Sequence, residues 1–180
     1  VLLSVGKDNV YIWEKGETRL HENEAAEILR EMCQGEYMHP TPVKEGKIEL
    51  VADIDGLLKV DSDKMKKING MGELMIASRH GNFAVKKGDK LAGTRIIPLV
   101  IEREKMEQAK AVCEGEPILE LKPFVHKKVG IVTTGNEVYY HRIEDTFTPV
   151  IKEKLAEYDT EVIGQEICND DYEKITKAIL

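Results

Sequence analysis

Apolar residues at helical spacing predict three helices in the first part of the chain. They recur three and four positions apart over residues 23–35, with acidic residues in the first turn and a glycine after the last apolar position, as at the ends of an amphipathic helix. The same pattern predicts helices over residues 61–69, where Asp61 can cap the first turn, and over residues 102–113, which a Gly and a Pro follow.

Short runs of β-branched and apolar residues lie between these helices. A run at residues 9–14 predicts one strand, and further runs between residues 43 and 101 are separated by Gly, Asp and Lys: IELVA, GLLKV, ELMIAS, FAV and LAGTRIIPLVI. Residues 86–89 predict a hairpin turn in which Gly88 takes a positive φ. We therefore expect residues 1–125 to form a β-rich, barrel-like domain with two or three helices, to which the sequence assigns no function.

The last third of the chain has a different pattern. Residues 129–134 are continuously apolar, which predicts a buried strand, residues 148–158 are amphipathic, residues 161–167 form a second strand pattern, and DDYEKITKAIL begins another helix. This alternation of strands and helices predicts a parallel sheet. We therefore expect an α/β domain over residues 126–180, with the boundary near Pro123, and a chain that is α+β overall.

Charge and composition exclude several classes of function. The net charge of -7 and the pI near 5.4 argue against a surface that binds nucleic acid or an anionic membrane. No apolar run reaches the roughly 20 residues of a membrane span, and the first residues do not resemble a signal peptide. Three widely spaced cysteines indicate reduced thiols, so we expect a cytoplasmic protein.

A candidate ligand site follows the first strand of the predicted parallel sheet. Ligands bind such sheets beyond the carboxyl ends of the strands, where this chain has Thr133, Thr134, Gly135, Asn136 and Glu137. Hydroxyl and amide groups can hydrogen-bond a phosphate or a polar heterocycle, and a glycine lets the ligand approach the backbone. An ordinary turn would also use Gly-Asn, so composition alone leaves both interpretations open.

The segment that begins VGIVTTGNEVYYHRIEDTFTP resembles the molybdopterin-binding domain of molybdopterin adenylyltransferases, molybdopterin molybdotransferases and competence-damage-inducible proteins. In that family the strand ends in Thr/Ser-Thr-Gly-x-Glu, which residues 133–137 match. A Gly-x-Ile-x-Asp-Thr/Ser stretch follows, matched by residues 141–146 with His141 in place of the glycine. An acidic residue then opens the second helix, where Asp170 and Asp171 stand.

The resemblance implies that the chain binds molybdopterin, or its adenylylated form, in molybdenum-cofactor biosynthesis and that it is a molybdotransferase-like transferase. Its ligand is then a small-molecule pterin phosphate. One wall of the site would be formed by residues 133–137, and Asp145 and Asp170 would face the phosphate, with Asp145 as a possible Mg²⁺ ligand. The family's glycine-rich segment has no counterpart in residues 129–180, so these residues supply half of the site, and we expect this chain alone to be inactive and to bind molybdopterin weakly if at all.

Alternatives remain open for individual residues and for the function. Asp145 can cap the following helix through Thr148, and Asp170 can cap the last helix, instead of facing a ligand. The α/β domain can also be the scaffold of a non-catalytic binding or assembly module, because one fold can serve proteins with different functions.

The ends of the chain predict a fragment and an assembly. The sequence starts at Val1 without Met and ends inside a predicted helix. Two parallel strands cannot bury both of their helices, and an open sheet edge pairs readily with another chain. We therefore expect a homo-oligomer, a contact with the β-rich domain, or an α/β unit that is visibly under-packed.

Overall fold

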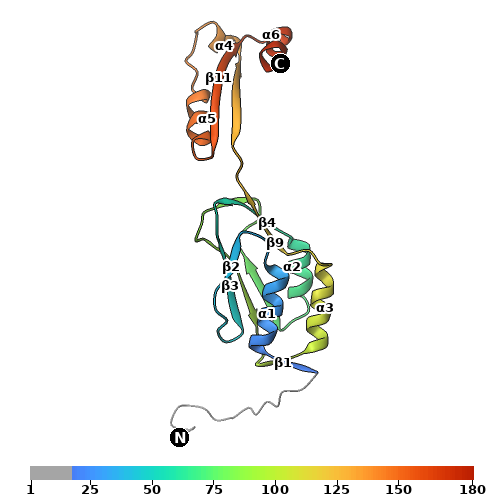
Figure 1. Ribbon diagram of the computed structural model, residues 1–180. Helices are drawn as coiled ribbons and strands as arrows, with labels where there is room; N and C mark the ends of the chain where they lie inside the picture. The colour runs from blue at the N-terminus through green and yellow to red at the C-terminus, as the bar shows by residue number, and fades with distance from the viewer. Residues whose placement is uncertain (1–17) are drawn as a thin grey trace. The chain divides into compact units, whose positions relative to one another are not determined.

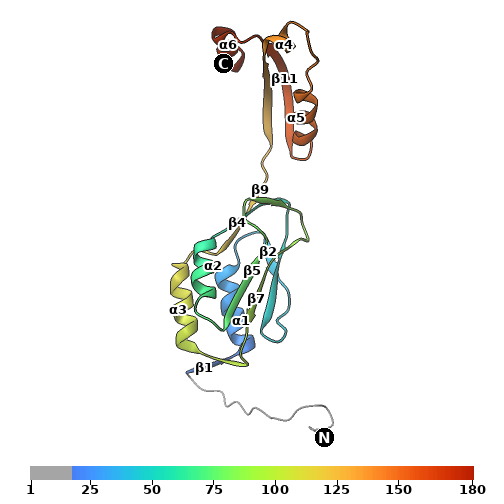
Figure 2. The ribbon, with the colours of Figure 1, turned by 180° about the vertical axis from the view of Figure 1, so that it is seen from behind.

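The computed structural model describes residues 18–180, so the strand predicted over residues 9–14 lies outside the described residues. The chain divides into two compact units, Val1–Pro123 and Phe124–Leu180. Figure 1 shows the elements of each unit, and Figure 2 shows them from behind. The described chain is a mixed α/β protein with several sheets and helices.

The larger sheet of the N-terminal unit has four antiparallel strands in the order β2-β3-β7-β5. They are β2 (Met38–Pro40), β3 (Lys47–Ala52), β5 (Leu74–Ser78) and β7 (Lys90–Ile96). Every second residue of β3 is buried, which is the pattern of a strand with one face on a core. The strands predicted from IELVA and ELMIAS are thereby confirmed.

A second sheet has three antiparallel strands in the order β6-β4-β9, and β1 pairs with β8. The bounds are β1 (Arg19–His21), β4 (Gly56–Val60), β6 (Phe83–Val85), β8 (Val100–Glu102) and β9 (Leu119–Pro123). Within residues 18–180 the strands form separate open sheets, and no sheet closes into a barrel. The barrel-like architecture expected from the sequence is therefore not confirmed.

The turn at residues 86–89 exists, but the hairpin predicted there is wrong. Gly88 has φ +88°, and the Asp89 N–H donates to the Lys86 carbonyl at 3.0 Å. However, β6 pairs with β4, whereas β7 pairs with β3 and β5. The turn therefore connects β6 of one sheet with β7 of another. Its Lys87 N–H donates to Asp55 and its Gly88 N–H donates to the Ala52 carbonyl.

The three helices predicted for this unit are confirmed as α1 (Glu22–Cys33), α2 (Ser62–Asn69) and α3 (Arg103–Cys113). Asp61 caps α2 by accepting the Lys64 N–H at 2.9 Å. At the start of α1 the cap is His21, whose side chain accepts the Asn23 N–H, while Glu24 accepts the His21 N–H. This reciprocal arrangement satisfies two otherwise free donors.

The core of the N-terminal unit lies where α1 and its neighbouring helices meet the four-stranded sheet (Figure 1). Leu29, Ile68 and Met106 place one residue of each helix in this core with no exposed surface. Ile48, Leu50 and Ile96 contribute from the strands. The helical periodicity therefore identified the correct buried faces, and the unit is stabilised mainly by the burial of these apolar side chains.

The C-terminal unit is built on two parallel strands, β10 (Lys127–Thr134) and β11 (Thr160–Cys168). The helices α4 (Asn136–Tyr139) and α5 (Phe147–Leu155) lie between them in the sequence, and α6 (Tyr172–Ile179) follows. Helices α5 and α6 lie to either side of the strand pair (Figures 1 and 2). This order confirms the predicted strand-helix-strand-helix unit with adjacent parallel strands.

Burial in the C-terminal unit is sparse, and the prediction of a buried first strand is wrong. Ile131 is the only residue of β10 that is buried. The apolar residues that were expected to bury the amphipathic face of α5 stay exposed, with Val150 at 49% and Ile151 at 41%. Two strands have too little surface to cover their helices, so the unit is under-packed, which is one of the three outcomes expected from the sequence.

Candidate functional site

The carboxyl ends of the two parallel strands form the candidate site. Thr134, the last residue of β10, pairs with Cys168, the last residue of β11. The loops that leave these two strands therefore begin side by side, as the sequence argument required. They bring the residues predicted for the site into two groups.

The first group centres on the Asp145 carboxylate. Oδ1 accepts the backbone N–H groups of Phe147 and Thr148, each at 3.0 Å. Oδ2 accepts the Thr148 hydroxyl at 2.5 Å and the Gln165 amide at 2.8 Å, and the Thr133 hydroxyl lies 3.4 Å away. Asp145 thus fixes the first turn of α5, as the capping alternative predicted, and also joins α5 to both strands.

Two residues of this group were not predicted as site residues. Thr148 is 3% exposed, and its hydroxyl lies 3.0 Å from that of Thr133 and 2.9 Å from the Gln165 amide nitrogen. A threonine three positions after a candidate capping Asp was a signal for the first of them. Gln165 gave no signal, because a polar residue on an exposed strand face is ordinary and its partner is 20 positions away.

These donors lower the pKa of Asp145 below its ordinary value. The largest cause is the hydrogen bond from the Thr148 side chain, followed by the Thr148 backbone N–H. The Phe147 N–H and the Gln165 amide act in the same direction, and partial desolvation opposes them. Hydrogen bonds stabilise the charged form of a carboxyl group, so Asp145 is a carboxylate at neutral pH.

The second group lies around Gly135. Its N–H donates to the Cys168 carbonyl at 3.2 Å, and its φ of +137° is one that L side chains rarely adopt. The next N–H, that of Asn136, donates to Asp170 Oδ2 at 3.4 Å. Asp170 is therefore at the loop after β10, whereas the cap of α6 is Asp171, which accepts the N–H groups of Glu173 and Lys174.

The other predicted residues shape the loop. Thr134 and Glu137 are exposed, and the Glu137 carbonyl accepts the N–H groups of Arg142 at 2.8 Å and Ile143 at 3.3 Å. His141, which stands where the resembling family has glycine, has φ +54°. The backbone thus keeps at His141 the left-handed conformation that glycine favours.

An open cavity of about 430 Å³ adjoins the Asp145 group. It is lined by Asp145, Thr148, Pro149, Lys152, Gln165 and Ile167. Lys152 adds a cationic side chain to this lining. Within residues 18–180 no three or more His, Cys, Asp or Glu side chains are arranged to hold a metal ion, so any cation here would depend on Asp145 together with ligand oxygens.

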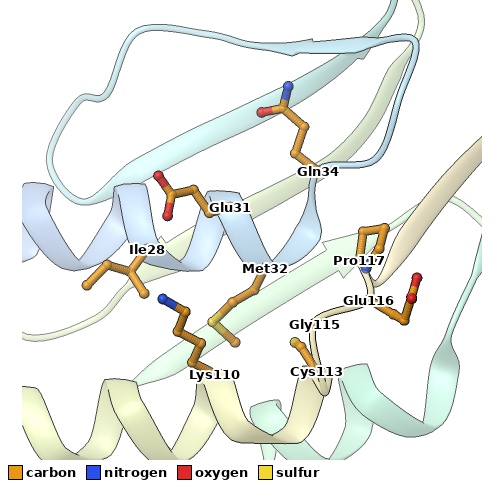
Figure 3. Close-up of a pocket in the computed structure, with 9 residues that line it drawn as sticks. All are labelled: Ile28, Glu31, Met32, Gln34, Lys110, Cys113, Gly115, Glu116 and Pro117. Carbon is orange, nitrogen blue, oxygen red and sulfur yellow. The ribbon is translucent and has the colours of Figure 1, made fainter.

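The N-terminal unit has a cavity of its own, between the C-terminal halves of α1 and α3 (Figure 3). Met32 from α1 and Lys110 from α3 extend into this space, and Cys113 lies near its floor. Burial raises the pKa of the Cys113 thiol. A thiol held in its neutral form is a poor nucleophile, so the cavity does not mark Cys113 as a reactive thiol.

None of the helices in residues 18–180 has both the length and the apolar character that a membrane-crossing helix needs.

Comparison with known proteins gives one match, in the C-terminal segment. No curated protein and no solved structure matches this chain. Residues 130–180, however, match the family model described as a probable molybdopterin binding domain. The match includes the Thr133–Asp145 group and the Gly135–Asp170 group and agrees with the family that the sequence motifs resemble. Residues 130–180 are therefore similar to the probable molybdopterin binding domain family.

Proposed function

We propose that the C-terminal unit binds molybdopterin, or its adenylylated form, and that the protein acts in molybdenum-cofactor biosynthesis as a molybdotransferase-like protein. The observation that carries this proposal is the convergence of two polar groups, Thr133–Asp145 and Gly135–Asn136–Asp170, at the carboxyl ends of adjacent parallel strands. Both groups lie inside the segment that matches the family. The cytoplasmic location and the homo-oligomer expected from the sequence belong to the same proposal.

The proposed site would act mainly by positioning and by charge. Residues 133–137 would form one wall, whose hydroxyl and amide groups can hydrogen-bond the pterin or its phosphate. Asp145 and Asp170 would lie on the phosphate side. Asp145 is the residue that would hold a Mg²⁺ ion there, because Mg²⁺ beside a phosphate commonly uses only one or two carboxylates. Charge stabilisation around a phosphate requires no protein nucleophile.

A second candidate is a non-catalytic assembly module that keeps the fold as a scaffold. It is favoured by the role of Asp145 at the start of α5, where the carboxylate accepts the N–H groups of Phe147 and Thr148. In this case Asp145 would stabilise α5 and would contact no ligand. The two candidates differ in one measurable property, which is pterin binding.

The test is to purify the affinity-tagged protein from the organism that makes it and to measure co-purifying pterin after oxidation to a fluorescent product. Asp170→Asn should lower the amount of bound pterin. Glu173→Gln is the matched control, because Glu173 is an exposed residue in the first turn of α6. Calorimetric titration with molybdopterin would give the affinity. If the purified protein carries no pterin, and titration gives no heat of binding while a molybdopterin-binding family member gives one under the same conditions, the proposal of pterin binding is wrong.

A further inference from the structure

The hydrogen bonds around Asp145 leave little room for a ligand. A carboxylate offers about four lone-pair sites. Two backbone N–H groups occupy Oδ1, and the Thr148 hydroxyl and the Gln165 amide bind Oδ2, with the Thr133 hydroxyl at 3.4 Å. A cation or an N–H donor of a ligand can reach Asp145 only if one of these donors leaves.

The donors differ in how easily they can leave. The N–H groups of Phe147 and Thr148 belong to the backbone at the start of α5. The Thr148 hydroxyl is on a side chain that is 3% exposed. Gln165 is an exposed residue with a long side chain, and rotation of that side chain can take its amide away from Asp145 without moving the backbone.

The orientation of the Gln165 amide follows from its partners. An ionised carboxylate only accepts hydrogen bonds, so the group that lies 2.8 Å from Asp145 Oδ2 must be the amide nitrogen. Gln165 and Asp145 both line the open cavity beside α5. Departure of the amide would therefore expose Asp145 Oδ2 to the cavity.

We propose that Gln165 is a positioning residue whose amide holds the place on Asp145 Oδ2 that the ligand or its bound cation takes. This inference rests on the proposed function. Binding then requires exchange of the Gln165 amide for a donor or cation of the ligand. The affinity of the site is lowered by the hydrogen bonds from the amide to Asp145 Oδ2 and to the Thr148 hydroxyl, which must be broken.

The change in molybdopterin affinity on removal of the Gln165 amide distinguishes the two roles. Affinity should rise if the amide must leave before the ligand binds, and fall if the amide supports the site. Gln165→Leu puts a shorter apolar side chain in place of the amide and removes the donor, so it should bind molybdopterin more tightly than the unchanged protein. The expected gain is of the order of tenfold, the scale of one hydrogen bond to a charged group. Glu166→Leu is the matched control, because Glu166 is the adjacent exposed residue of β11 and makes no hydrogen bond to Asp145.

A second measurement needs no ligand. In Gln165→Leu the Asp145 pKa, followed by NMR of the side-chain carboxyl carbon, should rise because one hydrogen bond that lowers it is lost. If the Asp145 pKa rises but the molybdopterin affinity of Gln165→Leu is weaker or unchanged, the ligand does not replace the Gln165 amide. Gln165 would then only stabilise the site. If neither the unchanged protein nor the variant binds molybdopterin, the proposed function itself fails and the exchange fails with it.

Discussion

The hydroxyl groups of Thr133 and Thr148 lie 3.0 Å apart, one at the end of β10 and the other in the first turn of α5. This contact joins the strand that begins the family segment to the helix that follows it. Thr148 is also the residue of the group with the least exposed surface. We therefore expect removal of the Thr148 hydroxyl to destabilise the hydrogen-bonded group around Asp145.

Thr148→Val should destabilise the C-terminal unit by about 1–3 kcal/mol, because a buried hydroxyl that serves three partners is replaced by a methyl group of the same shape. Hydrogen exchange of the β10 amides would measure the change in the free energy of local opening. Thr148→Ser, which keeps the hydroxyl, is the control and should cost less. Equal exchange rates in Thr148→Val and the unchanged protein would show that the hydroxyl contributes nothing.

Acid should weaken the start of α5 through Asp145. The pKa of Asp145 in the folded protein is below its ordinary value of 3.8, so its hydrogen bonds contribute stability above that value, and the contribution is lost as the pH falls through the lower folded pKa. NMR titration should show the amide signals of Phe147 and Thr148 shifting together with the Asp145 carboxyl signal. In Asp145→Asn this acid transition should be absent, and its persistence would assign it to another group.

Gly135→Ala should destabilise the loop after β10 by about 1–3 kcal/mol, the usual cost of a disfavoured backbone conformation. The cause is the φ of +137°, since an added Cβ would meet only Glu137 Oε2, at 3.5 Å. Gly164→Ala on β11 is the control, because nothing lies within 4 Å of the added Cβ. Thermal unfolding of both variants would compare them, and equal melting temperatures would rule out strain at Gly135.

The three cysteines should react with an alkylating reagent in a fixed order. Cys33 and Cys113 lie in the well-packed core of the N-terminal unit, and burial raises the Cys33 pKa to about 12, with a further contribution from Cys113. Cys168 is also buried but belongs to the sparsely packed C-terminal unit. The thiolate is the reactive form, so Cys168 should react first, after local opening.

Peptide mapping by mass spectrometry at mildly alkaline pH would determine this order. Cys168→Ser should delay the first labelling event and leave the rates at Cys33 and Cys113 unchanged. Earlier reaction of Cys33 would mean that the N-terminal core opens more readily than its packing indicates.

The sequence indicated individual elements well and their pairing poorly. The helices at residues 22–33 and 62–69 were found because the spacing of their apolar residues and the polar residues at their ends are local properties. The turn at Gly88 was found for the same reason. The predicted hairpin was wrong because β6 pairs with β4, whereas β7 pairs with β3 and β5. A local sequence pattern does not show which distant strand a given strand will pair with.

The candidate site shows the same division. By itself, the sequence determined that Thr133 ends the first parallel strand and that Gly135 and Asp145 follow it, because motif spacing and the order of strands and helices are local properties of the chain. Only the tertiary structure decided that Asp171, and not Asp170, caps α6, and that Gln165 binds Asp145. The reason is geometric, since a hydrogen bond depends on which atoms the pairing of β10 with β11 brings within about 3 Å, and residues far apart in sequence meet only after that pairing forms.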